Sequence, residues 1–262
     1  MNHAIRSLSL HLAMLVCLCL GVVDSAFAVA TEAGVVVNTE GSFVAKGAEG
    51  NLRSLATGGK VFAGDMLFTG KDGYARVKFA DGGLMSLRPN TQFKIEGFNF
   101  DEKEPGKDAA AFNLVKGGLR AVSGLIGKRG DPDSYAVKTH TATIGIRGTQ
   151  YGAQLCKGDC ADVPTPTGLP PDDGLHVDVS QGSVIVRNSA GTQLVNAGQY
   201  SFVQDAHTAP ISIPPERGIK VDIPARINID KVRATNTGEN KTGGGAAAVA
   251  PTNHTPNACP AP

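Results

Sequence analysis

The stretch Tyr74–Leu87 (YARVKFADGGLMSL) decides the fold class of this chain. Its first six residues alternate apolar and polar side chains, which is typical of a strand with one buried face. Asp81–Gly83 then interrupts the alternation, and Leu84–Leu87 resumes it. Because Asp and Gly accept the positive φ angles of tight hairpin turns, this stretch predicts a strand, a turn and a second strand.

The same pattern recurs on both sides of this stretch. Lys71–Gly73 is a turn signal that follows the apolar Met66–Phe68. Farther along, Val184–Val186 and Thr192–Val195 flank the polar Arg187–Gly191. Short strands that are joined by tight turns are therefore predicted over much of the chain.

The composition agrees with many turns and few helices. The 262 residues include 33 Gly, 15 Pro and no Trp, and 41% are hydrophobic, which is enough for a packed core. Lys and Arg number 25 against 24 Asp and Glu, so the formal charge is +1. A charge this small gives no reason to expect nucleic acid as a partner.

Two internal similarities indicate how the strands connect. Val61–Phe68 (VFAGDMLF) resembles Val195–Phe202 (VNAGQYSF), and Lys116–Leu119 (KGGL) resembles Gln181–Val184 (QGSV). Their separations do not form a regular repeat, which argues against a strict solenoid. We therefore expect an all-β fold, an irregular β-roll or short β-helix of short strands with glycine corners; a β-sandwich is the alternative.

The N-terminal segment has the pattern of a signal peptide. An apolar run, Leu8–Val23, follows Arg6 and precedes Ser25–Ala28, whose small residues match a cleavage site. We expect residues 1–28 to be removed. No later stretch approaches the roughly 20 apolar residues of a membrane span, so we expect a periplasmic or secreted protein without a transmembrane anchor.

Three cysteines follow the predicted cleavage site. Cys156 and Cys160 flank Gly158, which permits the tight bend of a short disulfide ring in an oxidising compartment. A metal site is the alternative, although two thiols need further ligands. Cys259 is then an odd thiol, available for pairing between chains.

Composition divides the remainder of the chain into three parts. We expect a β domain over residues 29–205 and an extended strap over residues 206–234, where Ile219–Ile223 alternates apolar and polar residues. Residues 235–262 are rich in Gly, Asn, Thr and Pro with almost no large aliphatic side chain. Such a tail cannot bury enough apolar surface to fold, so we expect disorder.

An ordered series of five motifs resembles the FecR domain. The resemblance implies an extracytoplasmic β-rich module, best known as the periplasmic part of regulators that relay an outer-membrane transport signal to a sigma factor. It spans roughly residues 34–203 and rests on GDMLFTG at Gly64–Gly70, FADGG at Phe79–Gly83, LRPNT at Leu87–Thr91, LVKGG at Leu114–Gly118 and ATIGIRGT at Ala142–Thr149.

The chain departs from those regulators in two places. The regulators place a cytoplasmic sigma-binding segment and a membrane helix before the periplasmic domain, whereas here the signal leads almost directly into the domain. We therefore expect no direct contact with a sigma factor, and a role in envelope sensing or protein–protein interaction with an envelope protein or a small ligand. His140 also stands where the family commonly has a proline.

No catalytic motif is present in the sequence. G-x-S-x-G, H-E-x-x-H and a phosphate-binding glycine loop are all missing, so we expect a non-enzymatic protein with no cofactor and no metal. Asp81 and Asp173 precede glycines without the acidic spacing of a calcium loop, which predicts turns. The histidines beyond the signal are expected at the surface or at strand edges: His140, His176, His207 and His254.

Arg147–Thr149 is the candidate partner-binding or ligand-binding site. Arg147 follows Ile146 and precedes Gly148 in a run that otherwise indicates a buried strand, and a buried guanidinium needs hydrogen-bond acceptors. We predict that Arg147 clamps backbone carbonyls or a carboxylate at a β corner. The alternative is that its guanidinium faces outward and holds an anionic ligand or partner.

A carbohydrate-binding or cell-wall-binding module is the alternative function. Such a module needs an exposed aromatic platform. Phe98, Phe100 and Tyr151 are the residues expected to supply it.

Overall fold

The computed structural model describes residues 31–129, 131 and 133–228. The predicted signal peptide, Cys259, His254 and the predicted tail lie outside the described residues. The described residues from Glu32 onward belong to one compact unit.

The described residues form strands and one short 3-10 helix, η1, at Pro105–Lys107, which confirms the all-β prediction. The strands predicted from the central stretch are β6 (Tyr74–Phe79) and β7 (Leu84–Leu87). None of the described residues forms a helix that is long and apolar enough to cross a membrane. The strands are β1 (Glu32–Glu40), β2 (Phe43–Lys46), β3 (Leu52–Ser54), β4 (Lys60–Phe62), β5 (Met66–Thr69), β6 (Tyr74–Phe79), β7 (Leu84–Leu87), β8 (Gln92–Asn99), β9 (Ala109–Val122), β10 (Tyr135–Lys138), β11 (Thr143–Cys156), β12 (Gly174–Asn188), β13 (Gly191–Asn196), β14 (Tyr200–Val203) and β15 (Ile211–Ile213).

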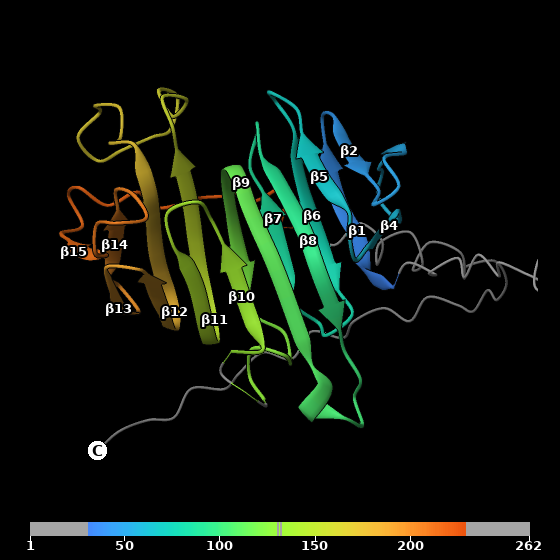
Figure 1. Ribbon diagram of the computed structural model, residues 1–262. Helices are drawn as coiled ribbons and strands as arrows, with labels where there is room; N and C mark the ends of the chain where they lie inside the picture. The colour runs from blue at the N-terminus through green and yellow to red at the C-terminus, as the bar shows by residue number, and fades with distance from the viewer. Residues whose placement is uncertain (1–30, 130, 132, 229–262) are drawn as a thin grey trace, which may run out of the picture. The chain divides into compact units, whose positions relative to one another are not determined.

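All these strands hydrogen-bond into one mixed sheet, in which they run side by side (Figure 1). Three long strands each take part in two separate groups of strands. The first half of β9 pairs with β8 and β10, and its second half pairs with β7 and β11. The two halves of β12 likewise pair with β14 and then with β13. The sheet therefore contains two layers that share β9, β11 and β12.

The long strands change layer at glycines. Gly117 in β9 and Gly182 in β12 have φ angles of 83° and 74°, in the left-handed region that favours glycine. A Cβ on Gly117 would lie 2.5 Å from Thr91 Oγ1, and a Cβ on Gly182 would lie 2.6 Å from the Gly148 carbonyl oxygen. The two similar tetrapeptides seen in the sequence are thus two equivalent corners, which confirms the predicted glycine corners.

The core lies between the two layers. Phe112, on the first half of β9, contacts the rings of Phe79, Phe93 and Tyr135 with centroid distances of 5.1, 5.4 and 5.5 Å. Phe79 belongs to β6 in the other layer and stacks on Phe98 at 5.4 Å. Because each buried aromatic side chain removes a large apolar area from water, this cluster stabilises the contact between the layers.

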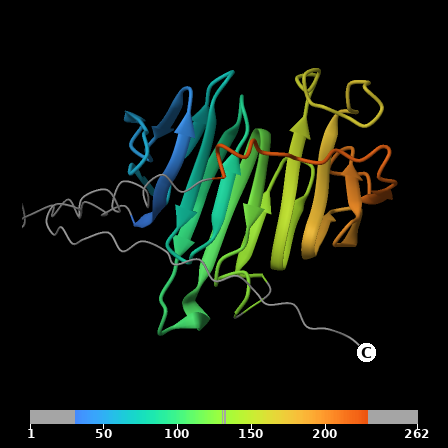
Figure 2. The same cartoon turned by 180° about the vertical axis from the view of Figure 1, so that it is seen from behind.

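The segment 214–228 has no ladder partner and crosses the outer side of the layer that contains β1, β6 and β12 (Figure 2). Asn38 of β1 donates from Nδ2 to the carbonyl oxygen of Arg226 at 2.7 Å. Ile219 and Ile227 are both 1% exposed. This segment lies within the predicted strap and covers one face of the sheet. From here on, the strap means residues 214–228.

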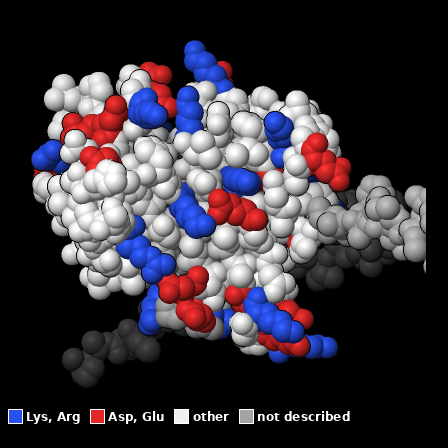
Figure 3. Space-filling model, in the orientation of Figure 1, with Lys and Arg blue, Asp and Glu red and all other residues white. Residues whose placement is uncertain are grey.

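The opposite side carries charges of both signs. Figure 3 shows that Lys and Arg side chains are interspersed there with Asp and Glu and separated by uncharged surface. Lys138 pairs with Glu96 at 3.1 Å, and Arg187 pairs with Asp133 at 3.0 Å. This face therefore has no extended patch of one sign, in agreement with the net charge of the chain.

Candidate functional site

The third corner of the sheet is the predicted site. β11 changes layer at Gly148, whose φ angle is 57°, and its pairing with β12 shifts register between Arg147 and Gln150. The Gly148 N–H donates to the carbonyl oxygen of Gly127 at 2.9 Å. The corner is therefore fixed to the turn that follows β9.

Thr149 holds this corner from the inside. It is 1% exposed, and its Oγ1 donates to the Ser183 carbonyl oxygen at 2.7 Å while its N–H donates to Ser123 Oγ at 2.9 Å. The Arg147 N–H in turn donates to Thr149 Oγ1 at 3.2 Å. Every polar group of Thr149 thus has a partner, since its carbonyl oxygen accepts from the Ser123 N–H at 3.0 Å.

The prediction that Arg147 is a buried clamp is wrong. Its side chain is exposed, and no described residue accepts a hydrogen bond from its guanidinium. The reason is the strand alternation: Ile144 and Ile146 face the core at 0% and 4% exposure, so the residue after Ile146 lies on the other face. The clamping role belongs to Thr149, and Arg147 faces outward as in the alternative interpretation.

A cavity of about 320 Å³ lies beside Arg147. Its apolar lining comes from Ile126, Ile146 and Tyr135, and Lys128, Arg129 and Arg147 line it with positive charge. Asp131 is the carboxylate among the lining residues.

The three cations differ in their partners. Arg129 is held by Asp108, with 3.0 Å between Nε and Oδ2, and by the carbonyl oxygens of Glu102 and Asp101. The side chains of Lys128 and Arg147 have no hydrogen-bond or ion-pair partner among the described residues. A guanidinium and an ammonium group beside a cavity with partly apolar walls favour a carboxylate or phosphate group on a bound molecule.

Tyr135, which lines this cavity, contacts a second buried tyrosine, Tyr151. The hydroxyl oxygens of Tyr135 and Tyr151 lie 3.1 Å apart. Burial raises the pKa of Tyr135 well above its usual value and also raises the pKa of Tyr151. Both phenols therefore stay protonated near neutral pH, and neither supplies a base or a nucleophile to the cavity.

Sequence reasoning missed Lys128 and Arg129. Both belong to the short stretch Gly127–Gly130 (GKRG), in which adjacent cations lie between two glycines after an apolar pair. Only the tertiary contact between Gly127 and Gly148 brings this stretch to the Arg147 corner. The sequence shows the two adjacent cations, but it does not show that they lie beside Arg147.

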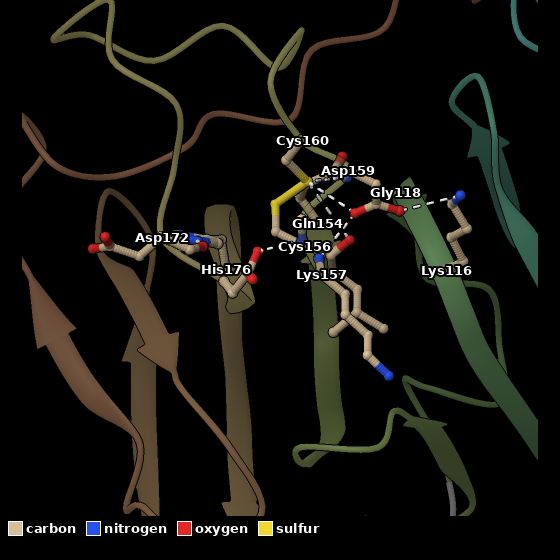
Figure 4. The surroundings of a disulfide bond; sticks show 12 residues. Lys116, Gly118, Gln154, Cys156, Lys157, Asp159, Cys160, Asp172 and His176 are labelled. Atoms are coloured by element: carbon tan, nitrogen blue, oxygen red, sulfur yellow. Dashed lines mark hydrogen bonds and ion pairs between the residues drawn. A yellow bond between two sulfur atoms is a disulfide. The ribbon is translucent and has the colours of Figure 1, made fainter.

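The structure places the sulfur atoms of Cys156 and Cys160 2.06 Å apart, at disulfide distance (Figure 4). Both cysteines are buried, at 1% and 4% exposure. Within the described part of the chain, no three His, Cys, Asp or Glu side chains come together so that they could hold a metal ion.

Two other expectations are corrected by burial. The aromatic platform does not exist as predicted, because Phe98 and Tyr151 are 6% and 0% exposed and the Arg129 guanidinium lies 5.0 Å from the ring centre of Phe100. His176 is not at the surface: it is 4% exposed, its Nε2 lies 2.8 Å from the Asp172 carbonyl oxygen, and the ring packs on Phe202.

Asp81 stabilises a turn, as the sequence indicated. It is 5% exposed, and its carboxylate accepts from the N–H groups of Gly83 and Ile126 at 2.9 and 3.3 Å. Burial raises the pKa of this carboxyl group. These contacts connect the β6–β7 turn to the turn after β9.

Comparison with known proteins finds one matching family model. Residues 65–185 match the family model described as FecR protein. This match confirms the resemblance that the motif series predicted, and the Arg147 corner and both paired cysteines lie inside the matched residues.

Two crystal structures of a protein named as a "putative anti-sigma factor" from Parabacteroides distasonis are similar to this chain at 13% sequence identity and a TM-score of 0.43. The match covers 58% of this chain and 60% of that one. No curated protein matches the sequence.

Proposed function

We propose that this chain is an exported, non-enzymatic FecR-type module that takes part in envelope sensing by binding a protein partner or a small ligand. The FecR match supports a signalling role. Cys156 and Cys160 at disulfide distance support an oxidising compartment. The signal-like N-terminal segment supports export, with residues 29–205 as the β domain.

The observation that carries the proposal is the unpaired guanidinium of Arg147 beside its cavity. Its backbone is fixed on the C-terminal side, because Gly148 and Thr149 are hydrogen-bonded to the turn after β9. A side chain on a fixed backbone loses less freedom on binding than one on a mobile loop. Arg147 and Lys128 are therefore well placed to bind an acidic group of a partner or ligand.

A charge-reversal experiment tests this role. The chain carrying Arg147→Glu or Lys128→Glu is compared with the wild type in affinity capture from envelope extract. Lys46→Glu, an exposed lysine on β2 outside the cavity, is the matched control. We expect one partner to be retained by the wild type and the control and lost by both cavity variants.

Two outcomes contradict the proposal. Equal retention by the wild type and the Arg147→Glu variant would remove the corner from the binding surface. Failure of the wild type to retain any partner would contradict the binding role itself. The free energies of unfolding of all variants are measured as well. They are expected to lie within about 0.5 kcal/mol of the wild type for exposed positions, which excludes loss of the fold as the cause.

A further inference from the structure

A second cavity, of about 260 Å³, lies at the other end of the same strand. Its walls are the β5–β6 turn, the loop after β7, the corner of β9 and the loop that begins at the paired cysteines. The polar side chains that line it include Lys71, Asp72, Arg88, Asn90, Gln154 and Asp162.

The inner wall of this cavity is the amide of Gln154. Gln154 is 4% exposed, its Oε1 accepts from Arg88 Nη1 at 2.9 Å, and its Nε2 lies 3.4 Å from Cys160 Sγ (Figure 4). A Cβ on Gly118 would lie 2.1 Å from Gln154 Oε1. Glycine at that position therefore leaves the space that the amide occupies.

The loop that forms the outer wall is fixed at its start. Cys156 and Cys160 close it into a short ring, and Lys116 Nζ on β9 lies 3.3 Å from Asp159 Oδ2 (Figure 4). A cavity whose walls are fixed before binding loses less conformational entropy when a ligand enters.

A second wall of the cavity, the loop after β7, contains Asn90, whose backbone conformation is constrained. Its φ angle is 55°, and among the described residues no other non-glycine residue has a positive φ. Its N–H donates to the Gly70 carbonyl oxygen at 3.0 Å, which keeps the loop against the β5–β6 turn. Constrained backbone of this kind is concentrated at ligand sites.

The cavity holds unpaired groups of both charges. Among the described residues, the side chains of Lys71, Asp72, Asn90 and Asp162 have no hydrogen-bond or ion-pair partner. Arg88 uses one guanidinium nitrogen for Gln154. A cation or an anion alone would therefore meet groups of its own sign, and an uncharged ligand would desolvate charges without pairing them.

We propose that this cavity binds a small zwitterion, with the carboxylate of the ligand beside Lys71 and Arg88 and its ammonium group beside Asp72 and Asp162. The volume is below the roughly 300–1,000 Å³ of pockets for drug-sized ligands, which restricts the occupant to a small molecule. A dipeptide with free ends has the required charges, together with an amide for Asn90 and Gln154.

Titration calorimetry of the purified full chain at low salt tests the proposal. The probe is glycylglycine, and the comparison ligand is the same dipeptide with an acetylated N-terminus and an amidated C-terminus. We expect saturable binding of glycylglycine and at least about tenfold weaker binding of the blocked form. Lys71→Met and Asp162→Asn each remove one charge from an exposed position and are expected to weaken binding about tenfold or more.

Lys103→Met and Glu49→Gln make the same chemical changes at exposed positions outside the cavity, and both are expected to bind as the wild type does. Absence of glycylglycine binding to the wild type would overturn the proposal. Equal binding of the free and blocked dipeptides would also overturn it, because recognition would then not depend on the ligand charges. The result is independent of the Arg147 corner, whose test uses a different cavity and a different probe.

Discussion

The strap depends on one glycine of β11, and this dependence yields a sharp prediction. Both backbone groups of Val221 are held by the sheet: its N–H donates to Asp178 Oδ2 at 3.1 Å, and its carbonyl oxygen accepts from Arg120 Nη1 at 3.1 Å. Arg120 and Asp178 are themselves paired at 3.0 Å. Gly152 lies directly beneath these groups.

Adding one methyl group at Gly152 forces this arrangement apart. The new Cβ would lie 2.1 Å from Asp178 Oδ2 and 2.5 Å from Val221 Cβ. Gly145, on the same strand, is the matched control, because its Cβ would meet nothing closer than the Ile185 carbonyl oxygen at 4.0 Å. Neither glycine has a positive φ, so neither substitution places a side chain on strained backbone.

The two substitutions are expected to change the free energy of unfolding in opposite directions. Overpacking costs about 1–3 kcal/mol, and losing a hydrogen bond to the buried Asp178 carboxylate costs about 1.5–3 kcal/mol. Because relaxation of the strap relieves part of the clash, we expect Gly152→Ala to lower the free energy of unfolding by about 2–4 kcal/mol. Gly145→Ala should raise it by about 0.5–1 kcal/mol, because glycine weakens a strand interior.

Urea unfolding of both variants beside the wild type measures these changes. Limited trypsin digestion at Lys220 adds a local readout, since cleavage there requires the strap to leave the sheet. We expect faster cleavage in the Gly152→Ala variant only. A Gly152→Ala midpoint equal to that of Gly145→Ala, with unchanged cleavage, would refute the reasoning.

Three further predictions follow from burial and composition. A thiol-alkylating reagent applied to the non-reduced chain should label neither Cys156 nor Cys160, and labelled peptides in mass spectra would contradict the disulfide. Burial lowers the pKa of His176 from 6.5, so the unfolded state binds the proton more tightly; stability should be full above about pH 6.5 and fall as the pH drops below it, and His176→Gln should reduce this slope in urea unfolding. Removing Thr235–Pro262 should shift the thermal midpoint by less than about 5 °C, because these residues bring almost no apolar surface; a larger fall would show that the tail docks.

Local patterns in the sequence were enough to predict the hairpins. The alternation of Tyr74–Phe79 and Leu84–Leu87 gave β6 and β7 with the bounds that the structure has. The glycines in the two similar tetrapeptides predicted corners, because a positive φ is a local property of the backbone.

Local patterns could not predict contacts between segments that are far apart in the sequence. Asn38 and Arg226, which join β1 to the strap, are 188 residues apart. The neighbours of Arg147 come from the turn after β9, and a single sequence does not show that this turn lies beside β11. His176 and Tyr151 illustrate the same point, since their burial depends on which strands cover them.

The specificity of the motif series has a structural cause in these distant contacts. Thr69, from the motif GDMLFTG, donates to the Arg88 carbonyl oxygen at 2.6 Å and accepts from the Thr91 N–H at 2.9 Å, both in LRPNT. Thr91 Oγ1 in turn exchanges hydrogen bonds with the backbone of Gly118 in LVKGG, both at 3.1 Å. Each motif is short and weak alone because its residues serve contacts with another motif. The ordered set is informative because those contacts exist only when all three segments meet at one corner, which is why the motifs predicted the domain while none of them identified a partner.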